Sequence, residues 1–287
     1  MSSFAELGLS RPVLRAVEKS GYTTATPIQA QAIPECLKGN DIVGASQTGT
    51  GKTAAFGLPI VSQLTPGTQP QCLILEPTRE LAAQVEEQMR NFGYYRPMNV
   101  VLLHGGVGYG AQNEGLATKP DVVIATPGRL IDHMERGSLK LDQIKHLVLD
   151  EVDRMLDMGF LPDVKRIIDR CPKNRQTQFY SATMPGANVA ARGLDITGVT
   201  HVINYRVPEN PEDYVHRIGR TGRAQKEGDA LTILSADELD YAKAVEHFVE
   251  QKIDRKKLEG FDYTYTALLD ENQKPLRKKR PAPKRRR

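Results

Sequence analysis

The chain has 287 residues, of which 39% are hydrophobic and 26% charged, and this balance is typical of a folded globular protein rather than a disordered one. Its formal net charge of +4 is unevenly distributed, because nine of the 39 Lys and Arg residues lie between 274 and 287 and none of the 35 Asp and Glu residues does. No stretch approaches the roughly 20 apolar residues of a membrane span, and the short polar start lacks the features of a secretion signal, so we expect a cytoplasmic protein.

Two helices and a strand are expected at the start of the chain. The first helix, Ser10–Lys19, begins with a capping serine and Pro12 and stops before Gly21. A second helix is expected at Pro27–Lys38, and the β-rich run Asp41–Ala45 follows it as a strand.

The loop after this strand is rich in glycine and opens a further helix at Thr53. It consists of Ser46, Gln47, Thr48, Gly49, Thr50, Gly51, Lys52 and Thr53. The glycines let the backbone amides and a helix N-terminus point at phosphates. In a loop of this kind Lys52 would reach the β- and γ-phosphates of ATP and the Thr53 hydroxyl would bind Mg²⁺. Ser46 departs from the usual glycine at the first position, and a simple turn between strand and helix is the alternative.

The middle of the chain alternates strands with helices. Strands are expected at Gln71–Leu75, Val100–His104 and Val122–Ala125, and helices at Arg79–Phe92 and Arg129–Arg136. This alternation predicts an α/β fold with a parallel sheet covered on both faces. In such sheets ligands bind beyond the carboxyl ends of the strands.

A strand expected at Leu147–Asp150 ends in two acids. Asp150 at the strand tip can hold Mg²⁺, directly or through water, and Glu151 can accept a proton from the attacking water. Taken alone, the two acids could also be the favourable acidic start of a helix. Together with the upstream phosphate loop, they favour a catalytic role.

The rhythm of strands and helices continues to about residue 184 and then breaks. The remaining elements expected from the pattern are a helix at Leu161–Arg170, strands at Thr177–Tyr180, Val202–Tyr205 and Ala230–Leu234, and a helix at Glu238–Phe248. The elements after residue 184 are too few for an independent core.

The end of the chain is a basic tail with several prolines, which cannot bury apolar surface and is expected to be disordered. It is either a solubilising end or an arm that neutralises phosphates. The three cysteines, Cys36, Cys72 and Cys171, are far apart and indicate neither a disulfide framework nor a zinc site.

Several short motifs, taken in order, resemble the bacterial-type DEAD-box ATP-dependent RNA helicase family. The sequence Asp150-Glu151-Val152-Asp153 and the sequence Ser181-Ala182-Thr183 are similar to two of its central motifs. The other similar segments are Thr26-Pro27-Ile28-Gln29 with the upstream aromatics Phe4 and Tyr22, Pro77 to Leu81, Gly105-Gly106, Thr126-Pro127-Gly128-Arg129, Ala191 to Asp195, and His216 to Arg223. Val152 replaces an alanine of the family pattern.

The resemblance implies roles for the residues of the first lobe. Tyr22 would stack on the adenine, and Gln29 would read its edge, although Thr26 and Gln29 also fit a capping box. RNA backbone contacts are implied for Pro77, Thr78, Arg79, Gly105, Gly106, Thr126, Pro127, Gly128 and Arg129. Such contacts carry no sequence information, so we expect RNA as a partner with little sequence preference. Structural salt bridges are the alternative for Arg79 and Arg129.

The resemblance also implies residues that couple the nucleotide to RNA. Ser181 and Thr183 would transmit the ATP state, unless they only satisfy backbone groups after a strand. The remaining implied residues are His216, which would pair with Asp153, Asp195 on the ribose, Arg192 on the phosphate side, and Arg220 and Arg223 as arginine fingers. A solvated basic helix face is the alternative for the arginines.

Compared with the family, this chain lacks most of a second RecA-like lobe, because only residues 184–189 separate the Ser-Ala-Thr motif from Ala190. We therefore expect a RecA-like P-loop ATP-binding domain at 1–186, a remnant of the second lobe at 187–258, and the tail at 259–287. The remnant should dock on the first lobe, associate, or stay mobile. The predicted function is an ATP-dependent RNA helicase, an RNA-dependent ATPase, with impaired turnover. The alternative is a catalytically inactive protein that binds nucleotide and RNA.

Overall fold

The computed structural model describes residues 3–45, 49–67, 69–181, 201–204, 207–208, 210–218, 229–235 and 238–255. Within them, eight strands form a single sheet in the order β3-β4-β2-β5-β6-β1-β7-β8, and every neighbouring pair is parallel. The strands are β1 (Ile42–Ala45), β2 (Cys72–Leu75), β3 (Val100–Leu103), β4 (Val122–Ala125), β5 (His146–Leu149), β6 (Gln176–Ser181), β7 (His201–Asn204) and β8 (Asp229–Thr232). The prediction of an α/β fold with a parallel sheet is therefore confirmed.

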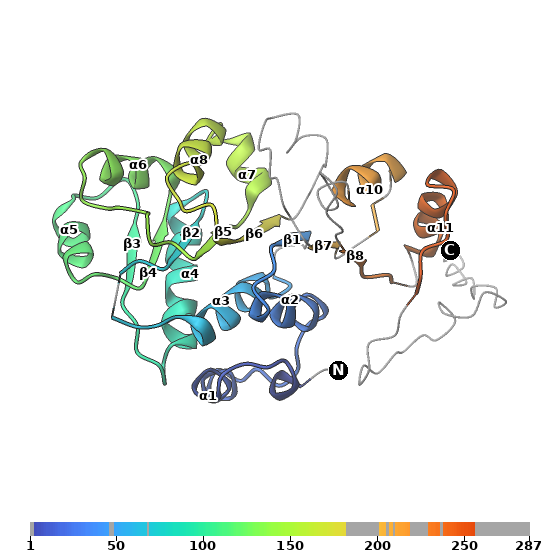
Figure 1. Ribbon diagram of the computed structural model, residues 1–287, viewed down its shortest axis with the longest axis horizontal. Coiled ribbons are helices and arrows are strands. Elements are labelled where there is room, and N and C mark those ends of the chain that lie inside the picture. The colour runs from blue at the N-terminus through green and yellow to red at the C-terminus, as the bar shows by residue number, and fades with distance from the viewer. Residues whose placement is uncertain are drawn as a thin grey trace, which may run out of the picture.

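The helices lie on both faces of this sheet (Figure 1). They are η1 (Phe4–Glu6), α1 (Arg11–Lys19), α2 (Pro27–Leu37), α3 (Lys52–Gln63), α4 (Arg79–Phe92), α5 (Gly110–Ala117), α6 (Pro127–Glu135), α7 (Val152–Asp157), α8 (Leu161–Ile168), α10 (Pro211–Ile218) and α11 (Leu239–Phe248). Of the described helices, none combines the length and the apolar character needed to cross a membrane.

Two hydrophobic clusters fill the spaces between the sheet and its helices. On β2, the side chains of Cys72 and Ile74 join a cluster with α1 to α4, whereas Leu73 and Leu75 join a second cluster with α6 to α8. Successive residues of a strand point to opposite faces, so a strand that is apolar throughout must be covered on both sides. This is the physical reason why these short runs form the centre of the fold.

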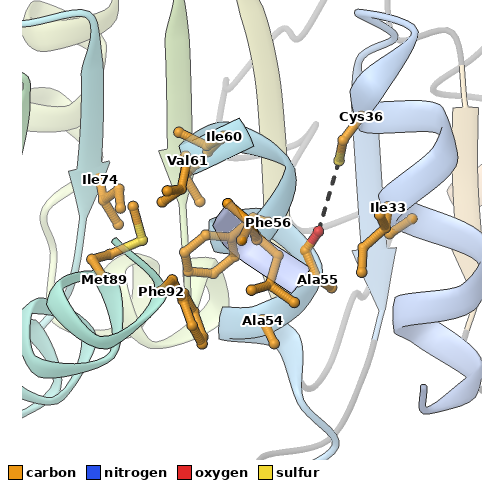
Figure 2. Close-up of a cluster of buried hydrophobic side chains, with 14 of the residues drawn as sticks. Ile33, Cys36, Ala54, Ala55, Phe56, Ile60, Val61, Ile74, Met89 and Phe92 are labelled. Carbon is orange, nitrogen blue, oxygen red and sulfur yellow. Dashed lines mark hydrogen bonds between the residues drawn. The ribbon is translucent and has the colours of Figure 1, made fainter. Parts of the chain in front are cut away.

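Helix α3 is buried on almost all sides because it lies between the sheet, α2 and α4. Figure 2 shows Phe56 of this helix together with Met89 and Phe92 of α4 in one cluster of buried hydrophobic side chains. A Cβ atom at Gly57 would approach Met89 Sδ and the Phe92 ring to 2.9 Å, so glycine at this position allows α3 and α4 to pack closely. The position of α3 matters because its first residue is Lys52.

Strand β1, which precedes the predicted phosphate loop, contains a glycine that lies against a buried aromatic ring. A Cβ atom at Gly44 would lie 2.6 Å from Cδ1 of Tyr180, a fully buried residue on the neighbouring strand β6. The hydroxyl of Tyr180 donates to Gln178 Oε1 at 3.0 Å, which restrains the ring. The ring therefore has little freedom to make room for a larger residue.

We predict that Gly44→Ala lowers the free energy of unfolding by about 1 to 3 kcal/mol, the usual cost of overpacking a well-packed core. Urea unfolding followed by circular dichroism measures this difference. Gly108→Ala is the matched control, because a Cβ atom at Gly108 would meet nothing within 4 Å. Equal stability of the two variants would show that Tyr180 can move aside.

The strands after residue 184 extend the same sheet. Strand β7 pairs with β1 from Ile42↔His201 to Ala45↔Asn204, and β8 pairs with β7. Val202 and Ile203 are buried in the two clusters on opposite faces of the sheet. The expected loss of strand neighbours is thus wrong for β7, and among the described strands only β8 and β3 lie at an edge. Of the three expected fates of the remnant, the structure shows docking.

The side chain of His201 adds contacts between β7 and its neighbours, and the helices that follow form a small cluster of their own. His201 Nε2 lies 3.3 Å from Glu35 Oε2 on α2 and 3.4 Å from Asp229 Oδ2 on β8. Helices α10 and α11 pack around Val207, Tyr214 and Val245, away from the two main clusters. Of the described parts of the remnant, β7 therefore shares the main core, whereas β8 extends the sheet with mostly exposed side chains.

Candidate functional site

Several of the predicted site residues follow strands at the carboxyl edge of the sheet. The loop before Lys52 follows β1, Asp150 follows β5, and Ser181 ends β6. Because neighbouring strands are parallel, their carboxyl ends meet at one edge, where ligands bind in sheets of this type. The order β5-β6-β1 brings the acids, the serine and the loop next to one another.

Lys52 is the centre of a buried ionic cluster. Its Nζ lies 2.5 Å from Glu151 Oε1 and 3.9 Å from Asp150 Oδ1. Lys52 and Asp150 are each 5% exposed, so the attraction is poorly screened by water. The lysine at the start of α3 and the acids after β5, 99 residues apart in the chain, thus face each other directly.

Glu151 has an unusual backbone conformation. Its φ of 50° and ψ of 47° place it in the left-handed region, which is costly for a residue with a side chain. Its amide donates to Asp150 Oδ1 at 2.9 Å, and its carboxylate is held by Lys52. These contacts hold the strained turn and direct the carboxylate toward the start of α3.

The environment of Asp150 favours its neutral form. Burial, followed by the charge of Glu151, raises the pKa of Asp150 to about 7, although the ammonium of Lys52 acts in the opposite direction. A cation at this position would reverse the balance, because it favours the ionised carboxylate.

A third acid, Glu76, was not predicted from the sequence. It follows β2, is 1% exposed, and its Oε1 has no hydrogen-bond partner among the described residues. Burial and the charges of Asp150 and Glu151 raise the pKa of Glu76 well above its ordinary value. The position of Glu76 after an apolar strand, like that of Asp150, could have indicated a site residue. Only the adjacent Pro-Thr-Arg motif was interpreted from the sequence.

The predicted adenine-reading segment lies against the phosphate loop. Gln29 Nε2 donates to the carbonyl of Gly51 at 3.2 Å, and Gln29 Oε1 accepts from the amide of Thr26 at 2.9 Å. Gly51 has a φ of 91°, and a Cβ atom there would lie 2.2 Å from Gln29 Nε2. Gly51 must therefore be glycine for two reasons, and Gln29 both caps α2 and supports the loop.

Tyr22 lies beside this segment. Its ring makes edge contacts with Phe4, at 5.8 Å between centroids, and with Phe92, at 6.4 Å. Burial raises the pKa of its hydroxyl. The ring is held in place by these neighbours, and its stacking on a base stays a prediction.

Two of the residues predicted to couple nucleotide and RNA, Asp153 and Ser181, contact each other. The amide of Asp153 in the first turn of α7 donates to Ser181 Oγ at 3.3 Å. The serine thus satisfies a backbone group, as the structural alternative proposed, and at the same time joins the end of β6 to the helix that follows the acids. The contact does not test a role in transmitting the nucleotide state.

The predicted RNA-backbone residues occupy the loops after β2, β3 and β4. Thr78 caps α4 by accepting from the amide of Leu81 at 3.3 Å, and it follows Pro77. Arg79 is exposed and pairs with Glu80, and its Nη1 would lie 3.3 Å from a Cβ atom at Gly106. The predicted motif that contains Arg79 therefore lies next to the predicted motif Gly105-Gly106.

Arg129 differs from Arg79 because it is buried. Helix α6 begins at Pro127, after Thr126 and before Gly128, two residues earlier than predicted, since proline suits a first helical turn. Arg129 Nη2 donates to the carbonyl of Val107 at 2.9 Å, and the guanidinium lies 4.3 Å from the Tyr109 ring centroid. Its Nε also lies 3.7 Å from Asp132 Oδ2, so the salt bridge of the structural alternative is present, although Nε and Nη1 make no hydrogen bond among the described residues.

Other predicted residues lie outside the described residues. They are Ser46, Gln47, Thr48, Thr183, Arg192, Asp195, Arg220 and Arg223, together with the side chain of His216. Helix α10 ends at Ile218, before the arginines.

The donor atoms at the site are suited to a hard divalent cation. Asp150, Glu151 and Glu76 offer carboxylate oxygens, and Thr53 lies in the first turn of α3. In the described part of the chain, no group of three His, Cys, Asp or Glu residues is arranged to hold a metal directly. Mg²⁺ usually takes one or two carboxylates and keeps several waters.

Comparisons with known proteins agree with this geometry. Residues 26–191 match the DEAD/DEAH box helicase model, and residues 163–225 match the helicase conserved C-terminal domain model. The ATP-dependent RNA helicase CshA of Limosilactobacillus reuteri is 36% identical over 353 residues, covering 85% of this chain and 71% of the relative. The DEAD-box ATP-dependent RNA helicase CshA of Geobacillus kaustophilus is 34% identical over 367 residues, covering 90% and 79%.

Both alignments are longer than this chain of 287 residues, so each relative contains internal residues that this chain lacks. Among solved structures, a DEAD box protein from the hyperthermophile Methanococcus jannaschii has a TM-score of 0.61 at 27% identity, covering 89% of this chain and 99% of that chain. A hypothetical ATP-dependent RNA helicase from Sulfolobus tokodaii has a TM-score of 0.59 at 27% identity, covering 83% and 100%.

Proposed function

Because this chain belongs to the DEAD/DEAH box helicase family, a family of ATP-dependent RNA helicases, we propose that it binds ATP with Mg²⁺ at the carboxyl edge of its sheet and binds RNA beside it. The observation that carries this proposal is the placement of Lys52 at the start of α3, 2.5 Å from Glu151 and 3.9 Å from Asp150. A lysine and acids from distant strands meet at a helix N-terminus, which is where phosphates bind.

Each residue of the cluster has a distinct proposed role. Lys52 binds the β- and γ-phosphates, to which it moves from its present contact with Glu151. Thr53 and Asp150 hold Mg²⁺, and Glu151, released from the lysine, orients the attacking water and accepts its proton. When bound, Mg²⁺ would offset the negative charge that develops on the phosphates.

The proposed adenine site lies at the N-terminus of α2. Gln29 is held by the amide of Thr26 and the carbonyl of Gly51, so its side chain is already oriented next to the loop. Tyr22, supported by Phe4 and Phe92, supplies the stacking surface. Pre-orientation of this kind reduces the entropy lost on binding.

The proposed RNA surface is formed by the loops after β2, β3 and β4. Arg79 is exposed beside Gly106, so its guanidinium can reach a phosphate at little cost. Arg129 would have to give up its contact with Val107, although two of its nitrogens make no hydrogen bond in the described structure. Contacts from these loops go to the RNA backbone and give little sequence preference.

We further propose that turnover is impaired in this chain. The segment that carries Arg220 and Arg223 follows α10, which packs with α11 in a small cluster of its own. The division into domains at 1–186, 187–258 and 259–287 remains our proposal, with the qualification that β7 and β8 share the sheet of the first domain. The second candidate function is therefore a nucleotide- and RNA-binding protein without productive hydrolysis.

Isothermal titration calorimetry with ADP and a non-hydrolysable ATP analogue tests nucleotide binding. Fluorescence anisotropy with a labelled single-stranded RNA tests RNA binding. We expect nucleotide to bind only when Mg²⁺ is present or much more tightly with it, and RNA affinity to fall steeply with salt. The absence of binding heat with every adenine nucleotide would refute the nucleotide site.

A further inference from the structure

Glu76 and Asp150 occupy equivalent positions after neighbouring strands, and the charge of Asp150 acts on Glu76. Strand β2 pairs with β5 in the register Leu75↔Leu149, so the two acids are the next residues on neighbouring strands. The Asp150 amide donates to the Leu75 carbonyl at 3.1 Å, and the Glu76 amide donates to the Ala125 carbonyl at 3.0 Å, so the ladder continues through both positions. Residues in register on adjacent strands lie about 4.8 Å apart and point to the same face.

The charges around Glu76 do not balance. Three carboxylates, those of Glu76, Asp150 and Glu151, act on one another, and Lys52 is the base that acts on Glu76. Lys52 makes its short contact with Glu151, and Glu76 Oε1 is buried without a hydrogen-bond partner in the described structure. A buried carboxylate oxygen without a partner is costly, so this arrangement indicates a donor that arrives with a ligand.

The donor that fits best is water bound to a divalent cation. In the described part of the chain, no three His, Cys, Asp or Glu residues are arranged to hold a metal together, so we place Glu76 outside the direct ligands. Mg²⁺ keeps several of its waters when it binds a nucleotide and one or two carboxylates. Residues that accept hydrogen bonds from the coordination shell commonly change metal affinity by 10- to 100-fold.

We propose that Glu76 is a positioning residue of the nucleotide–magnesium site, whose free carboxylate oxygen accepts a hydrogen bond from a water molecule bound to the cation. This inference rests on the proposed nucleotide site and adds a residue to it. The cation satisfies the buried oxygen of Glu76 and offsets the repulsion among the three acids. Nucleotide binding therefore depends more strongly on Mg²⁺ than it would with Asp150 and Glu151 alone.

The test measures ADP affinity by calorimetry at a series of Mg²⁺ concentrations and in EDTA, for the whole chain and for Glu76→Gln. The substitution keeps the shape of the side chain and removes its charge. We expect the Mg²⁺ concentration at half-maximal binding to rise about tenfold, while ADP affinity in EDTA stays the same, because no cation-bound water is then present for Glu76 to contact. Glu87→Gln, which removes an exposed charge of α4, should match the wild type.

Two further arms separate the possible outcomes. Glu76→Asp keeps the charge and should recover part of the Mg²⁺ dependence, which also covers the case that Glu76→Gln folds poorly. Identical Mg²⁺ dependence of Glu76→Gln and wild type would show a buried neutral side chain with a structural role and overturn the inference, while the proposed function stands. A wild-type chain that binds no nucleotide at any Mg²⁺ concentration would overturn both.

Discussion

Hydrolysis of ATP by this chain, with or without RNA, is expected to be slower by about 10³-fold or more than hydrolysis by a relative that has the internal residues missing here. A single arginine finger accounts for about 10³ to 10⁵ in rate in related phosphoryl-transfer enzymes. Arg220 and Arg223 follow α10, and this helix packs with α11 rather than within the two main clusters. A pair of arginines must be aimed to within a fraction of an ångström to stabilise charge in the transition state, and misplacement by 1 Å can cost about 10²-fold.

A coupled assay of ADP release measures this rate, with Lys52→Ala as the background. The Geobacillus kaustophilus relative, aligned over 367 residues, is a suitable reference. A chimera that inserts the corresponding segment of this relative between Met184 and Ala190 should recover RNA-stimulated hydrolysis. Turnover by the unmodified chain at the rate of the reference, lost in Lys52→Ala, would contradict the proposed impairment.

Replacing Lys52 by alanine is expected to lower the free energy of unfolding of the nucleotide-free chain by about 3 to 5 kcal/mol, because removing one partner of a buried ion pair leaves the other charge uncompensated. Here the charge left behind is mainly that of Glu151, which lies 2.5 Å from a lysine side chain that is only 6% exposed. Nucleotide affinity should fall by about 10- to 100-fold as well, the value of a hydrogen bond to a charged group.

The loss of stability should depend on pH in a definite direction. The pKa of Asp150 is already raised by burial to about 7 with Lys52 present. An acid whose pKa is raised on folding binds its proton more tightly in the folded state, so stability increases as the pH falls from that pKa toward the unfolded value of 3.8. The deficit of Lys52→Ala should therefore be largest above about pH 7 and shrink toward pH 5.

Urea unfolding at several pH values measures both effects. Lys38→Ala is the matched control, because Lys38 is 64% exposed and its pair with Glu35 lies at the surface, where such pairs contribute about 0 to 1 kcal/mol. The double variant Lys52→Ala/Glu151→Gln should regain part of the lost stability, since the two side chains interact directly. Equal stability of Lys52→Ala and Lys38→Ala at pH 8 would show that the cluster is not held by its lysine.

Much of the fold could be predicted because local chemistry in these segments is unambiguous. Helix α4 was predicted with its observed bounds, since Thr78 caps it and its apolar residues recur on one face. Strand β4 was also predicted with its observed bounds. The start of α6 was placed two residues late because the proline at its first turn was assigned to the preceding loop.

The meeting of Lys52 with the acids after β5 could be predicted as well, because both follow strands of one parallel sheet whose carboxyl ends lie at the same edge. The chemical roles of these residues stay predictions. Other features depend on contacts between residues far apart in the chain. The pairing of β7 with β1 could not be predicted. The apolar residues of 201–204 indicate that the strand must be buried, but they do not indicate which strand it pairs with.

The same distinction applies to the site. The residue type of Glu151 does not reveal that its backbone is left-handed, and that of Glu76 does not reveal its burial beside Asp150. Strand runs and helix caps follow from interactions within a few residues, which the order of amino acids specifies directly. The pairing of β2 with β5, the burial of three acids around one lysine and the pKa of Asp150 follow from the packing of distant segments, because burial and charge–charge distance exist only in the assembled sheet.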